Sequence, residues 1–153
     1  MNSLIQQLTH SISRSITIIC AGAFAVFSAT AWADDAKETL AAYETVSKAL
    51  LADDLAAAQK AAGNLASTAD AESALAKHAT ALQKSNSLES ARDHFKAVSD
   101  EAIKLAEGKE GYHVMTCPMV DGGEWLQTSE KVANPYMGKK MPACGAKKKA
   151  GSA

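Results

Sequence analysis

The chain has 153 residues, 16 of them Lys or Arg and 17 Asp or Glu, and 47% of its residues are apolar but only 5% aromatic. This balance excludes the dominant basic face that a nucleic-acid-binding protein needs. The 120 residues beyond residue 33, with a net charge of −2, suffice for one domain with a thin core and are too few for a multidomain enzyme.

Residues 1–33 have the three parts of a secretory signal peptide. Arg14 precedes a mostly apolar run over 16–27, and small residues end in Ala31-Trp32-Ala33. The pattern predicts cleavage after Ala33 and a periplasmic protein with no membrane span after signal removal. A retained anchor is the lesser alternative, because the apolar run falls short of the roughly 20 residues that cross a bilayer. Cys20 lacks a small residue before it, so lipidation there is disfavoured.

Residues 36–108 contain no proline and much alanine, and their apolar residues recur at helical spacing. Asp53 or Asp54 is expected to cap a second helix and Asp70 a third, short one, while Asn86 and Glu89 resemble a capping box for a fourth. The four apolar stripes are Leu40, Tyr43, Val46 and Leu50; Leu55, Ala58, Ala62 and Leu65; Leu75, His78, Ala79 and Leu82; and Leu88, Ala91, Phe95, Val98, Ala102 and Leu105.

These stripes predict an all-α fold: a small antiparallel bundle of about four helices, because short connections favour antiparallel neighbours. The prolines and glycines that follow predict an irregular C-terminal metal-binding segment packed on the bundle. We expect one domain over 34–145 and a flexible tail over 146–153. Alanine stripes bury little area, so the bundle needs help from the segment that follows it.

All sulfur residues of the mature chain fall within the 30 residues from 115 to 144. Methionine usually fills gaps in a core, yet the four predicted helices contain none. The candidate ligands are His113, Met115, Cys117, Met119, Met137, Met141 and Cys144.

The first four donors occupy alternate positions, so an extended chain would point them to one side. Neighbouring donors would lie roughly 6–7 Å apart, which lets two of them reach one ion but not all four. Pro118 makes a bend next to Cys117 plausible, and Gly138 and Pro142 disfavour a continuous helix in the far half. A folded loop that returns the far sulfurs to the first group is therefore expected.

Thiolates and thioethers are soft ligands that select Cu(I), and Ag(I) by the same logic, whereas methionine adds little to a zinc site. Thioethers also stay competent in an oxidising compartment, where thiols can be lost. The sequence thus predicts a periplasmic Cu(I)-binding protein for copper buffering, resistance or delivery to efflux. It is not expected to be an enzyme, since no paired carboxylates, nucleophile–base arrangement or phosphate loop is evident.

The stretch from His113 to Gly145 resembles a bacterial domain family of formally unknown function, found among secreted proteins and appended to copper/silver efflux adaptors. That resemblance implies copper binding and an efflux adaptor as a partner. The helix containing Arg92, Phe95 and Ser99 resembles the same family. Met137 departs from it by standing where an aromatic residue is expected. The matching positions are Cys117, Pro118, Met119, Gly123, Trp125, Leu126, Asn134, Pro135, Tyr136, Gly138, Met141, Cys144 and Gly145.

Two other interpretations remain open. A Cys117–Cys144 disulfide would close a loop of 28 residues and add roughly 3–4 kcal/mol, which would make the chain a stapled helical interaction module without metal. A zinc-structured domain is the other. Trp125 and Tyr136, with Tyr112, are expected to pack the segment on the bundle. Asn134 and Pro135 are also assigned a structural role.

Overall fold

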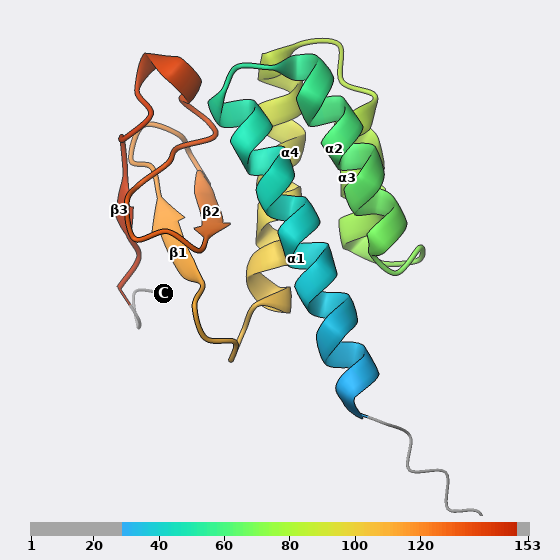
Figure 1. The fold of residues 1–153 in the computed structure, drawn as a ribbon. Helices are drawn as coiled ribbons and strands as arrows, with labels where there is room; N and C mark the ends of the chain where they lie inside the picture. The colour runs from blue at the N-terminus through green and yellow to red at the C-terminus, as the bar shows by residue number, and fades with distance from the viewer. Residues whose placement is uncertain (1–28, 150–153) are drawn as a thin grey trace, which may run out of the picture.

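The computed structural model describes residues 29–149, so residues 1–28 of the predicted signal peptide, including Cys20, lie outside the described residues. Four helices form a bundle, and the C-terminal segment packs beside α1 and α4 as a separate layer (Figure 1). The helices are α1 (Ala29–Leu51), α2 (Leu55–Thr68), α3 (Ala74–Gln83) and α4 (Leu88–Leu105). The predicted cleavage site after Ala33 lies within α1.

The bundle prediction is confirmed, and the stripes build its core. Leu40, Tyr43 and Val46 of α1 are completely buried, as are Phe95 and Val98 of α4. Consecutive helices pack against each other, and α3 is the shortest of the four, as expected. Since about half of the buried helical positions are alanine, the helices contribute a narrow core that the C-terminal layer extends.

The helix starts differ in part from those expected. Asp54 caps α2 by accepting a hydrogen bond from the Ala57 N–H, as predicted. For α3 the cap is Ser73 rather than Asp70. The Asp70 carboxylate instead accepts a hydrogen bond from the Glu72 N–H in the turn that precedes α3. For α4 the cap is Ser87 rather than Asn86, and its hydroxyl accepts from the Ser90 N–H. Serine hydroxyls compete well with Asp and Asn as caps, so sequence alone did not separate neighbouring candidates.

The fold is mostly helical but not purely all-α, because the segment expected to be irregular contains a small antiparallel sheet. Its strands are β1 (His113–Thr116), β2 (Glu124–Gln127) and β3 (Ala146–Lys147), in the order β2-β1-β3. Met115 of β1 pairs with Trp125 on one side and with Lys147 on the other. The alternation over 113–119 was the strand signal, although the four-residue strands are too short to stand out from loops by composition. The tail predicted from residue 146 is likewise part of the sheet at Ala146–Lys147.

An aromatic stack joins the sheet to the bundle. Tyr43 of α1 stacks on Phe95 of α4 at 5.3 Å, and Phe95 contacts Tyr136, which meets the edge of Trp125 in β2. The Tyr43 hydroxyl accepts from the Leu126 N–H at 3.0 Å and pairs with Ser99 at 2.9 Å. Burial raises the pKa of Tyr43 far above its ordinary value, so its hydroxyl stays protonated. Trp125 and Tyr136 are both buried in this stack.

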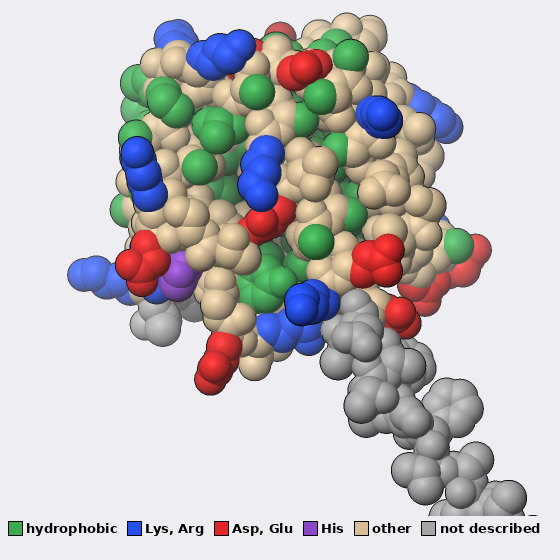
Figure 2. Space-filling model, viewed as in Figure 1, with side chains coloured by type: hydrophobic (Ala, Val, Ile, Leu, Met, Phe, Trp, Pro, Cys, Tyr) green, Lys and Arg blue, Asp and Glu red, His purple; other side chains and the backbone are tan. Residues whose placement is uncertain are grey.

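The part of the chain that the structure describes has no helix both long and apolar enough to pass through a lipid bilayer. On the face shown in Figure 2, acidic and basic side chains are interspersed. Lys148, the residue that follows β3, forms an ion pair with Glu124 of β2 at 2.8 Å.

Candidate metal site

The C-terminal layer brings two thiols together. The Sγ atoms of Cys117 and Cys144 lie 3.8 Å apart although 27 positions separate the residues in the chain, and both are free cysteines. Cys117 is buried and Cys144 is half-buried. The two sulfurs are therefore close enough to bind one ion and are not covalently joined.

Cys117 is held at the start of the tight connection between β1 and β2. Its N–H donates to the Gly123 carbonyl at 2.8 Å, and its carbonyl accepts from the Val120 N–H at 3.3 Å. The chain reverses here immediately after the cysteine, as the Pro118 bend predicted. This turn fixes the backbone of Cys117 to the sheet.

Cys144 is held from the other side by a loop organised around Asn134. The Asn134 Nδ2 donates to the Cys144 carbonyl at 2.6 Å, while its Oδ1 accepts from the N–H groups of Tyr136 and Met137. Its backbone N–H donates to the Pro142 carbonyl at 2.8 Å. One fully buried side chain thereby closes the loop over 134–144, which supports the structural role assigned to it.

The loop lies on the aromatic stack. The Tyr136 hydroxyl donates to the Glu124 carbonyl at 2.6 Å, which ties the loop to β2. Immediately after Cys144, the chain passes so close to Trp125 that a Cβ on Gly145 would lie 2.8 Å from its ring and 2.8 Å from the Thr116 carbonyl. The residue after Cys144 therefore packs directly against the Trp125 ring.

The thioethers differ in exposure. Met119, two residues after Cys117, is 66% exposed. Met137 and Met141 are half-buried and lie on the loop that carries Cys144. No α-helix spans that loop, since Gly138–Lys140 forms only a single 3-10 turn, η1, consistent with the folded loop expected there.

The two remaining predicted donors are placed differently. Met115 is completely buried and belongs to the hydrophobic core. His113 lies at the far end of β1, about 13 Å along the strand from Cys117. The structure therefore brings Cys117 and Cys144 together directly, uses Met115 for packing and leaves His113 apart from the thiol pair.

The pKa of the half-buried Cys144 thiol lies above its ordinary value. Desolvation raises the pKa of Cys144, and the neighbouring Cys117 raises it further. A metal ion binding the Cys144 sulfur would therefore displace its proton. Among the described residues, no three His, Cys, Asp or Glu side chains converge as a metal site. A site made of two cysteines and one or more methionines has only two residues of these four types, so it is compatible with that finding.

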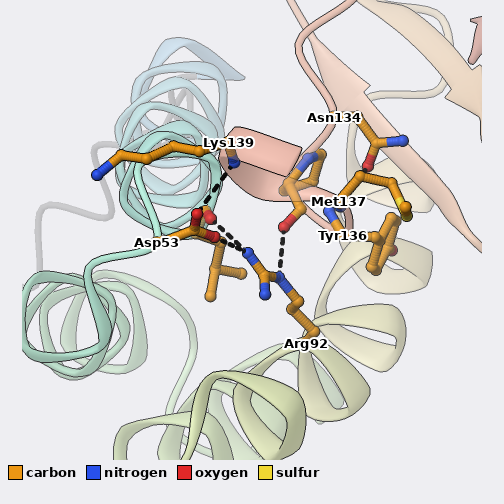
Figure 3. Close-up of polar contacts among 8 residues, drawn as sticks. Asp53, Arg92, Asn134, Tyr136, Met137 and Lys139 are labelled. Atoms are coloured by element: carbon orange, nitrogen blue, oxygen red, sulfur yellow. Dashed lines mark hydrogen bonds and ion pairs between the residues drawn. The ribbon is translucent and has the colours of Figure 1, made fainter. Parts of the chain in front are cut away.

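A polar cluster behind the loop was missed from the sequence. Arg92 of α4 forms an ion pair with Asp53, in the three-residue connection between α1 and α2. It also donates to the carbonyls of Leu50 and Pro135 (Figure 3). The Arg92 contact and the Lys139 N–H hold the pKa of Asp53 below its ordinary range. The available signal was the Asp53-Asp54 doublet, in which only one carboxylate is needed as a helix cap.

The fold and the thiol pair define a four-helix domain that carries a small sheet and two adjacent cysteines. Residues 39–112 match a family model described as "Protein of unknown function (DUF3347)". The matched region begins in α1 and ends at Tyr112, one residue before β1. It therefore includes α2–α4 and stops short of every predicted metal ligand. No curated protein and no solved structure matches the chain.

Proposed function

We propose that the chain is a periplasmic Cu(I)- and Ag(I)-binding protein that buffers copper, confers resistance or delivers the ion to an efflux system. The observation that carries the proposal is the 3.8 Å separation of the Cys117 and Cys144 sulfurs. Copper here is the cargo of the protein. An efflux adaptor is the proposed partner.

The sulfur separation suits two ligands of one ion. Two thiolates bound at about 2.3 Å with an angle between tetrahedral and trigonal lie about 3.8–4.0 Å apart. That distance suits zinc as well, so the choice of metal depends on the other donors. Thioethers favour a soft monovalent ion over zinc. Three methionines of this segment are at least partly exposed and so remain candidate donors: Met119, Met137 and Met141.

Exposure also supports a thioether role for Met119. Met119 contributes little hydrophobic stabilisation to the core, because most of its surface stays in water. It is nevertheless accessible to an incoming ion. We propose that Cys117, Cys144 and Met119 are the ligands that first bind the incoming ion, and that Met141 or Met137 supplies the remaining ligand.

The test is titration of the reduced, exported protein with Cu(I) against a competing chromophoric chelator. The wild type is expected to take up copper stoichiometrically, Cys117→Ser and Cys144→Ser to lose tight binding, and Met119→Leu to weaken it at least tenfold. His78→Gln is the matched control, because it removes a donor on α3, which packs on α2 and α4 rather than on the sheet. Equal binding by the wild type and the double cysteine variant would refute the proposal.

The second candidate is the disulfide-stapled interaction module. The same distance favours it, because the two sulfurs need to move only from 3.8 Å to about 2.05 Å apart to form the bond. Mass spectrometry of the exported protein under non-denaturing conditions separates the two candidates, since it reports signal cleavage, bound metal and disulfide state together. Competition between zinc and Cu(I) tests the zinc interpretation.

A further inference from the structure

We propose that the Arg92–Asp53 ion pair sets the distance between the two thiols by fixing the 134–144 loop to the helical bundle. The two cysteines belong to different parts of the C-terminal layer. Cys117 is fixed by the β1–β2 turn, whereas Cys144 depends on the loop. A contact that positions the loop therefore controls how often the sulfurs meet. Only the copper-binding part of this inference rests on the proposed function.

Arg92 reaches three segments at once. Its Nε donates to the Pro135 carbonyl at 2.9 Å, and its Nη2 donates to the Leu50 carbonyl at 2.9 Å while pairing with the Asp53 carboxylate. Figure 3 shows the guanidinium between the α1–α2 connection and the loop. The planar guanidinium has fixed donor directions, so one side chain holds the end of α1 and the start of the loop in a defined relation.

Asp53 completes the attachment from the other side. Its Oδ2 accepts from the Lys139 N–H at 3.1 Å, so the carboxylate binds η1 as well as Arg92. Gly138 has φ +54°, and a Cβ there would overlap both Asp53 and Arg92. The loop therefore approaches the ion pair as closely as a backbone without a side chain allows.

The attachment is relayed to the sulfur by adjacent residues. Pro135, held by Arg92, follows Asn134, whose side chain binds the Cys144 carbonyl. A shift of the loop start would thus move Cys144 relative to Cys117. No ligand is needed for this effect, which makes it measurable in metal-free protein.

The experiment measures the thiol–disulfide equilibrium of the full metal-free protein in glutathione buffers. Two protein thiols react with one glutathione disulfide to give the protein disulfide and two glutathione molecules, so the equilibrium constant reports the effective concentration of the two thiols. Arg92→Lys keeps the positive charge but cannot contact Leu50, Asp53 and Pro135 at the same time. Asp53→Asn removes the ion pair. Each is expected to change the constant at least fivefold toward the open dithiol.

Two controls separate positioning from general stability. Glu101→Gln breaks an exposed ion pair with Lys104 on the same helix, away from the loop, and is expected to leave the constant unchanged. Ala62→Gly is expected to lower the melting temperature, because glycine weakens α2, but to leave the thiol–disulfide equilibrium constant unchanged. Wild-type constants in both Arg92→Lys and Asp53→Asn, with circular dichroism showing both folded, would overturn the inference. So would an equal change in Ala62→Gly.

Copper titration of the same variants adds the second arm. Arg92→Lys is expected to weaken Cu(I) binding at least fivefold although every sulfur is present, with Glu101→Gln again unchanged. Unchanged copper affinity in Arg92→Lys would overturn the inference for the metal site. A wild type that binds no Cu(I) would instead refute the proposed function, and the glutathione result would still decide whether Arg92 positions the thiols.

Discussion

At the scale of single residues, close contacts explain why particular side chains are required. Gly138 and Gly108 both have positive φ, +54° and +74°, but a Cβ has no neighbour within 4 Å at Gly108 and overlaps the ion pair at Gly138. Backbone strain is therefore common to both positions, whereas the steric conflict belongs to Gly138 alone.

Gly138→Ala is expected to lower the free energy of unfolding by about 3 kcal/mol, of which about 1–2 kcal/mol is the cost of left-handed backbone. Gly108→Ala, the matched control, is expected to lose only the backbone part. Chemical denaturation of the two variants measures the difference. Equal losses would show that the loop moves away from Arg92 at little cost.

Asp53 gives a pH-dependent test at the same scale. Its pKa is lower in the folded protein than the ordinary value of about 3.9, so the folded state binds fewer protons there and the unfolded state more. The stabilisation is complete above that ordinary value and is lost as pH falls through the lower folded pKa. Denaturation between pH 6 and pH 2 should show the wild type losing its advantage over Asp53→Asn. A constant difference would contradict the assignment.

At the scale of elements, β1 shows that one run of alternating residues serves two purposes. Met115 is completely buried opposite Trp125, while Met119, beyond the end of the strand, is 66% exposed. The same residue type thus packs the core at one position and faces solvent at the other. Alternation predicted a shared side for these residues, and burial of that side depends on the helices against which the sheet packs.

Met115→Ala is expected to lower the free energy of unfolding by about 2–5 kcal/mol, because it opens a cavity beside Trp125. Met119→Ala is expected to change it by less than about 0.5 kcal/mol. Urea denaturation of both variants checks this contrast. Similar losses at the two positions would place Met119 in the packed structure rather than at an open site.

At the scale of the whole molecule, the helices and the C-terminal layer depend on each other. Phe95 lies between Tyr43 of the bundle and Tyr136 of the loop, and the Leu126 N–H donates to the Tyr43 hydroxyl. The region matched by the family model ends before these C-terminal partners.

A chain ending at residue 112 is therefore expected to keep helical circular dichroism but to lose cooperative melting, since Met115, Trp125, Leu126 and Tyr136 leave the core. Near-ultraviolet circular dichroism and calorimetry measure this loss. A truncated chain that melted cooperatively at the full chain's temperature would show that the bundle is independent of the sheet.

The helices and the location of the sulfur-rich segment could be predicted from the sequence, because helical periodicity and composition are local properties of the chain. The sequence also anticipated the bend after Cys117, since proline restricts its neighbour wherever it stands. The approach of Cys117 to Cys144, the burial of Met115 and the ion pair of Arg92 with Asp53 could not be predicted in this way. Those contacts join residues tens of positions apart, and their formation depends on loop closure and on the packing of every element between them, which no local pattern encodes.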